Sequence, residues 1–159
     1  MRFTRKSRLS GLAAVLLFCS LSSWSQDSDD ELEFLPVEQA FPVTVNRDSN
    51  GDMRLFWPIP KGYYLYKKKF SFYAKSVRGT QALDATFPAG VVHEDEFFGR
   101  SEVFYGKLLI RLHSAALTQS FVLEIRSQGC ADAGLCYPPR KQFYEIGAWQ
   151  RSPSKRNTR

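Results

Sequence analysis

Two stretches decide the fold: LLIRLH at residues 108–113 and FVLEIR at residues 121–126. In each of them every second side chain is apolar: Leu108, Ile110 and Leu112, then Phe121, Leu123 and Ile125. A period of two places these side chains on one face of an extended chain. The pattern therefore predicts two half-buried β-strands.

Shorter runs of the same kind extend the β pattern to most of the chain. We predict further strands at Met53–Trp57, Tyr63–Tyr66, Phe70–Lys75 and Gln142–Ile146. The sequence DSNGD at residues 48–52 is a strong turn signal and predicts a hairpin at the first of these strands. No window of twelve or more residues has a convincing helical pattern. The chain is thus expected to be an all-β, antiparallel β-sandwich.

Composition and charge exclude two broad classes of protein. A hydrophobic content of 43% with 13 Phe and 7 Tyr is incompatible with a disordered chain. The formal charge is +6, but residues 1–25 and 151–159 each hold four basic residues and no acidic one. The 14 basic and 16 acidic residues between them leave a net charge of −2 there. A basic groove for nucleic acid is therefore not expected.

The ends of the chain predict export and a single domain. A basic start, the apolar run LAAVLLFCSL at residues 12–21 and small residues near Ser25 are typical of a cleaved signal peptide over residues 1–25. The alternative, lipidation of Cys19, is disfavoured because the bulky Phe18 precedes it. We expect a flexible acidic segment at 26–33, one domain at 34–149 and a disordered basic tail at 150–159.

Two cysteines remain after the signal peptide, in the sequence GCADAGLCYPP at residues 129–139. An even pair in an exported chain indicates a disulfide between Cys130 and Cys136. A loop of this length stabilises a fold by roughly 2–2.5 kcal/mol, so a structural clip and a redox-active pair are equally compatible with the residues. Zinc is not expected, because only His93 and His113 are available as soft partners.

The sequence HEDEFFG at residues 93–99 is a second unusual segment. Three acidic residues directly before two phenylalanines are poor strand material, so we expect a loop here. Phenylalanines on a loop either plug the end of a sandwich or cover and bind something. The acidic side chains are compatible with a solvated turn as well as with a site.

Together these segments resemble the N-terminal periplasmic domain of the thiol:disulfide interchange protein DsbD family. The resemblance covers about residues 34–147. It is carried by PVEQAF at 36–41, GYYLYK at 62–67, HEDEFFGRSE at 93–102 and GCADAGLCYPP at 129–139. It implies an immunoglobulin-like β-sandwich and a redox-active rather than a structural disulfide.

The resemblance also implies roles for particular residues. Cys136 would attack the disulfide of a partner and Cys130 would resolve the mixed disulfide. The remaining predicted site residues form a cap and its surroundings: Phe97 as a shield, with Phe98 beside it on the same loop, Tyr64 and Tyr66 lining the site, and Asp95 and Glu96 next to it. As like charges near a thiolate, the two acids are expected to raise the pKa of the cysteines. They would serve either as proton acceptors during exchange or as a restraint on an otherwise hyper-reactive pair.

The function implied by the resemblance is a periplasmic relay that needs no cofactor. A membrane thiol transporter would donate electrons, and thioredoxin-like proteins, including disulfide isomerases and a cytochrome c maturation factor, would receive them. The alternative is a non-enzymatic exported binding module with a structural disulfide. The redox potential separates the two, since a clip lies below roughly −300 mV.

Overall fold

A computed structural model describes residues 33–48, 50–113 and 115–149. The predicted signal peptide with Cys19, nearly all of the acidic segment 26–33 and the basic tail at 150–159 lie outside these ranges. The elements are, in order, α1 (Val37–Ala40), β1 (Thr44–Arg47), β2 (Met53–Pro58), β3 (Tyr63–Tyr66), η1 (Lys67–Lys69), β4 (Ser71–Ser76), β5 (Gly79–Ala82), β6 (Asp84–Thr86), β7 (Val91–Asp95), β8 (Gly99–Phe104), β9 (Lys107–His113), η2 (Ala115–Thr118), β10 (Phe121–Ser127), β11 (Gly129–Ala131) and β12 (Arg140–Ile146).

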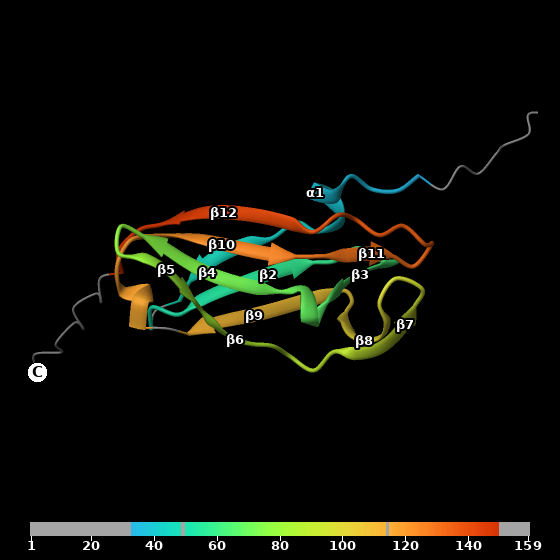
Figure 1. Ribbon diagram of the computed structural model, residues 1–159, viewed down its shortest axis with the longest axis horizontal. Coiled ribbons are helices and arrows are strands. Elements are labelled where there is room, and N and C mark those ends of the chain that lie inside the picture. Colours follow the sequence, from blue (N-terminus) through green and yellow to red (C-terminus); the bar gives the residue numbers. More distant parts are fainter. Residues whose placement is uncertain (1–32, 49, 114, 150–159) are drawn as a thin grey trace, which may run out of the picture. The chain divides into compact units, whose positions relative to one another are not determined.

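The strands form three antiparallel four-stranded sheets, and the predicted all-β fold is confirmed (Figure 1). The strand orders are β1-β2-β9-β6, β12-β10-β4-β5 and β11-β3-β8-β7. The predicted hairpin is also confirmed, because Arg47 pairs with Met53 across the turn. Asp48 stabilises that turn, since its Oδ1 accepts hydrogen bonds from the backbone N–H groups of Asn50 and Asp52 at 2.9 and 3.1 Å.

The first two sheets enclose one hydrophobic core. The alternating side chains of β9 and β10 that the sequence singled out are buried in it, together with side chains of β2 and β4. Leu108, Ile110, Leu123 and Ile125 have no exposed surface. Each such side chain stabilises the fold by about 1.5–3 kcal/mol relative to an exposed one. Among the described residues, no helix is long and apolar enough to cross a membrane.

Strand β3 connects this core to a second buried cluster. All four of its residues are buried, which is unusual for an alternating strand. Tyr63 and Leu65 face the main core, whereas Tyr64 and Tyr66 join a smaller cluster with Val103 and Cys130. The third sheet, to which β3 belongs, lies at the end of the sandwich remote from the β4–β5 turn (Figure 1).

Two tyrosine hydroxyls fasten the N-terminal segment to this end. The backbone N–H of Leu35 donates to Tyr63 Oη at 2.8 Å, and Tyr137 Oη donates to the carbonyl oxygen of Leu35 at 2.5 Å. Burial, with the hydrogen bond to Tyr63, raises the pKa of Tyr137 to about 12, so its hydroxyl stays protonated and can donate. We call this pair of contacts the tyrosine clasp.

The prediction of a loop over residues 93–99 is wrong for most of that segment. His93, Glu94 and Asp95 belong to β7, and Gly99 begins β8, so the turn is limited to residues 96–98. Because β7 is an edge strand, its acidic side chains need not all enter a core. The register Asp95↔Gly99 fixes where the turn begins and ends.

Candidate functional site

The two cysteines lie across a tight turn and form a disulfide. Cys130 lies in β11, opposite Tyr64 of β3, and an antiparallel bridge pairs it with Cys136. The turn is closed by a 2.7 Å hydrogen bond from the N–H of Ala131 to the carbonyl of Leu135. Cys130 is completely buried, whereas Cys136 is partly exposed. Cys136 is therefore the more accessible of the two cysteines.

Gly129 allows β11 to approach β3 this closely. A Cβ atom at this position would lie 2.3 Å from the carbonyl oxygen of Tyr64 and 2.6 Å from the ring of Phe41. Both neighbours are held in place, one as backbone and the other as a core ring packed against Tyr137. A glycine directly before Cys130 is thus a requirement of the site's geometry.

The hydroxyl of Tyr66 links the disulfide to a carboxylate. Its oxygen lies 3.3 Å from Cys130 Sγ and 3.8 Å from Cys136 Sγ. The same hydroxyl donates a 2.6 Å hydrogen bond to Asp95 Oδ2. Burial, followed by the hydrogen bond to Asp95, raises the pKa of Tyr66 well above its usual range, so it remains a phenol.

Asp95 connects the two tyrosines of the site to the turn at residues 96–98. Its Oδ2 also accepts a hydrogen bond from Tyr64 at 3.2 Å, and its Oδ1 accepts the backbone N–H groups of Phe97 at 3.0 Å and Phe98 at 2.7 Å. Its side chain is only 8% exposed. Burial by itself would raise the pKa of Asp95, but the hydrogen bonds from Tyr66, Phe98, Tyr64 and Phe97 outweigh it and lower the pKa. Asp95 is therefore a carboxylate at neutral pH, and it orders both tyrosines and the turn.

The turn at residues 96–98 carries the other predicted site residues, and they differ in how far they are buried. The ring of Phe98 packs edge-on against Tyr66, with 4.8 Å between the ring centroids, and contacts the cluster that contains Cys130. Phe97 is 43% exposed, and the side chain of Glu96 is exposed as well. The structure thus brings Cys130, Cys136, Tyr64, Tyr66, Asp95 and Phe98 together, whereas Phe97 and Glu96 point to the surface of the turn.

Three residues that were not assigned to the site extend it outward. Tyr105 donates to Asp132 Oδ1 at 2.8 Å and lies 3.3 Å from His93 Nδ1. The ring of His93 packs against Tyr64, with 4.5 Å between centroids. Burial and the bond to Asp132 raise the pKa of Tyr105. Asp132 and His93 stand in the two unusual sequence segments, but no local pattern singles out Tyr105.

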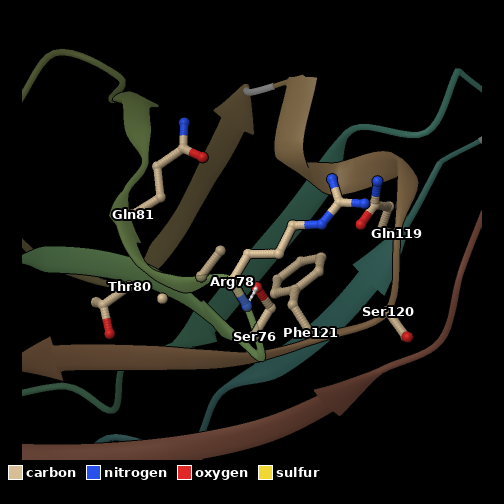
Figure 2. A pocket seen from close by; sticks show the side chains of 9 residues that line it. Ser76, Arg78, Thr80, Gln81, Gln119, Ser120 and Phe121 are labelled. Atoms are coloured by element: carbon tan, nitrogen blue, oxygen red, sulfur yellow. Dashed lines mark hydrogen bonds between the residues drawn. The ribbon is translucent and has the colours of Figure 1, made fainter.

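One hollow among the described residues is separate from this site. A cavity of about 260 Å³ lies at the β4–β5 turn, and Figure 2 shows Arg78 reaching across it toward Gln119. None of the predicted site residues lines it. Within residues 33–48, 50–113 and 115–149, no group of three or more His, Cys, Asp or Glu side chains is arranged to hold a metal ion.

The fold and the site define a class of protein: an antiparallel β-sandwich that carries a partly exposed disulfide at one end, beside a phenol–carboxylate pair. The sequence matches the family described as "Thiol:disulfide interchange protein DsbD, N-terminal" over residues 31–148. The chain belongs to this family of DsbD N-terminal domains.

Individual relatives agree with this assignment. The chain is 42% identical over 144 residues to thiol:disulfide interchange protein DsbD 2 of Pseudomonas aeruginosa, covering 86% of this chain and 23% of that protein. It is 36% identical over 127 residues to DsbD of Escherichia coli, covering 79% of this chain and 22% of the other. The chain therefore spans about a quarter of the length of the curated relatives it matches.

Solved structures show the same fold, which in this family is immunoglobulin-like. The reduced DsbD N-terminal domain of Neisseria meningitidis superimposes with a TM-score of 0.65 at 29% identity, covering 72% of this chain and 90% of that one. A second match, with a TM-score of 0.60 at 30% identity, is the complex between the DsbD N-terminal and PilB N-terminal domains of the same organism, covering 71% and 87%.

Proposed function

We propose that this domain is a thiol–disulfide exchange relay of the protein-disulfide reductase type, with Cys130 and Cys136 as its reacting pair. The observation that carries the proposal is the asymmetry of the disulfide: Cys136 is partly exposed, whereas Cys130 is buried beside Tyr66, which is bonded to Asp95. A structural clip needs no such arrangement. Membership of the DsbD N-terminal family supports the same chemistry.

The reaction begins from the reduced pair. The thiolate of Cys136 attacks one sulfur of the partner's disulfide, and the partner's other sulfur leaves as a thiolate and takes up a proton. Cys130 then loses its proton and attacks Cys136 Sγ, which breaks the bond between the two proteins. The partner leaves with two electrons and two protons, and this domain is left with the Cys130–Cys136 disulfide.

Tyr66 and Asp95 provide a route for the proton that Cys130 must lose. The single proton of the Tyr66 hydroxyl is engaged by Asp95, and in the disulfide the phenol oxygen lies 3.3 Å from Cys130 Sγ. In the reduced pair this oxygen is therefore positioned to accept the S–H of Cys130. A carboxylate that accepts four hydrogen bonds is a stable negative charge that polarises this phenol. Tyr64 keeps Asp95 aligned from the other side.

We infer that the turn at residues 96–98 controls access to the pair Cys130–Cys136. Phe98 packs on the cluster that contains Cys130, and Cys136 packs against the same cluster. Phe97, beside Phe98 on the turn, is exposed and available to a docking partner. Glu96 adds negative charge at the rim, which disfavours stray thiolates. A docking partner displaces this turn before exchange.

The relay we propose is exported to the periplasm by a cleaved signal peptide. A membrane thiol transporter donates the electrons, and thioredoxin-like proteins, among them disulfide isomerases and a cytochrome c maturation factor, accept them. The solved complex of a related domain with the PilB N-terminal domain supports docking of a separate protein partner.

The first test is the equilibrium potential of Cys130–Cys136 in a glutathione or dithiothreitol buffer, combined with exchange to a thioredoxin-like protein. A relay has a potential within reach of such proteins and exchanges readily. A value below roughly −300 mV with slow exchange would instead establish a structural clip in a binding module.

Trapping variants form the second test. In Cys130→Ala the mixed disulfide between Cys136 and a partner cannot be resolved, so it accumulates on denaturing gels without reductant. Cys136→Ala is the matched control, because the remaining Cys130 is buried and traps little. Equal trapping by the two variants would contradict the assigned roles.

A further inference from the structure

Three consecutive lysines follow β3 directly and form η1 (Lys67–Lys69). The first, Lys67, pairs with Glu102 Oε2 at 2.8 Å. The other two reach the turn at residues 96–98 instead. Lys68 Nζ donates to the carbonyl oxygen of Phe98 at 3.3 Å, and Lys69 Nζ lies 3.8 Å from the centroid of the Phe98 ring.

An ammonium group this close to an aromatic face is attracted by the negative charge density of the ring. Lys68 Nζ adds a second, weaker contact at 5.2 Å from the same centroid. Phe98 is therefore held at four points: its ring face by Lys69, its ring edge by Tyr66, its N–H by Asp95 and its carbonyl by Lys68 and, at 3.4 Å, by the hydroxyl of Ser101. Of these residues, the two lysines are the charged ones that lie outside the group surrounding the disulfide.

We propose that Lys68 and Lys69 are positioning residues for the exchange reaction, which hold the turn at residues 96–98 against the cysteine site through Phe98. This inference rests on the proposed function, since it assigns the lysines to the access step. Without the lysines, Phe98 keeps its contact with Tyr66 and its bond to Asp95, so the turn loosens but does not unfold. Cys136 is then reached more often by reagents from solution.

The rate at which dithiothreitol reduces the oxidised chain measures this access directly. Lys69→Met keeps the length of the side chain and removes its charge, and we expect reduction to become about two- to fivefold faster. Lys69→Arg keeps a cation over the ring and should react at the wild-type rate. Lys107→Met removes an exposed lysine of β9 and is the control for net charge. Thermal unfolding of each variant verifies that the fold is retained.

Two further measurements separate this role from general stabilisation. In a Phe98→Leu background, which keeps apolar cover but removes the ring, Lys69→Met should have no additional effect on the rate. In the wild type, the ε-CH₂ protons of Lys69 should resonate upfield because they lie over the ring, and Phe98→Leu should return them to their ordinary position. Lys68→Met, with the longer contact, should accelerate reduction less than Lys69→Met.

Three results would overturn the proposal: an unchanged rate in Lys69→Met, a Lys69→Arg variant as fast as Lys69→Met, or an effect that persists without the Phe98 ring. Failure of the proposed function looks different. In that case the wild type does not exchange with thioredoxin-like proteins, whereas the ratio of dithiothreitol rates and the lysine resonance still report whether the contact exists.

Discussion

Asp95→Asn tests the hub of the site, because it preserves the shape of the side chain and removes its charge. The carboxylate accepts four hydrogen bonds, from the hydroxyls of Tyr66 and Tyr64 and from two backbone N–H groups of the turn. An amide offers one acceptor oxygen, so about half of these donors lose their acceptor. Hydrogen bonds to a charged group contribute about 1.5–3 kcal/mol each. With partial compensation by water, we expect the free energy of unfolding to fall by about 2–3 kcal/mol at pH 7.

The pKa of Asp95 determines how the stability difference between the wild type and Asp95→Asn changes with pH. The pKa of Asp95 is lowered in the folded state, so its contribution to stability is complete above the unfolded value of about 3.9. The contribution is lost as the pH falls through the lower, folded pKa. The difference between the wild type and Asp95→Asn should therefore be largest at neutral pH and shrink below about pH 4.

Urea unfolding of the oxidised proteins at pH 7 and pH 3, followed by fluorescence, measures both quantities. Glu96→Gln is the matched control, because it removes the neighbouring charge from an exposed position and should change stability by less than about 0.5 kcal/mol. A loss of the same size in the two variants, or a loss in Asp95→Asn that is independent of pH, would refute the account of Asp95 as a buried, fully bonded carboxylate.

Three further substitutions test other parts of the structure. Gly129→Ala should lower the free energy of unfolding by about 1–3 kcal/mol, because the added methyl group overlaps β3. Gly147→Ala is the control, since its methyl group meets no atom within 4 Å, and equal effects of the two variants would contradict the close approach of β11 to β3. Tyr66→Phe should slow reduction of a partner disulfide by about tenfold or more without a comparable change in Tyr73→Phe, as stopped-flow fluorescence would show. Leu123→Ala should cost about 2–5 kcal/mol in thermal or urea unfolding, and a smaller loss would mean that β10 is less tightly packed than its burial indicates.

The strands were predictable where one face meets the core and the other meets solvent. The alternation of β9 and of the hairpin strand β2 is of this kind, because burial follows the period of the backbone. The alternation of apolar residues does not predict β7, because His93–Asp95 are polar and the strand exists through its pairing with β8. An edge strand of this sort is held by its backbone hydrogen bonds, and its side chains carry no signal of it.

The site was predictable from its sequence segments but not from any local pattern. Tyr66 and Cys130 are 64 residues apart, and only the pairing of β3 with β11 places them together. The same limitation applies to Tyr105 and to the lysines beside Phe98, because their partners Asp132 and Phe98 lie in turns distant in the sequence. Sequence identified the chemistry at the disulfide, and sheet register determined which side chains surround it.

The tyrosine clasp has a consequence for the order in which the domain folds. It joins Leu35 to Tyr63, 28 residues later, and to Tyr137, 102 residues later. Tyr137 directly follows Cys136, so the contact of Leu35 with Tyr137 cannot form before both cysteines have been synthesised. Contacts of such long range form slowly, since most of the chain must be ordered before they are made. The clasp therefore ties the segment around Leu35 to the residue directly after the cysteine turn, so a change in that turn is also felt at the N-terminal segment of the domain.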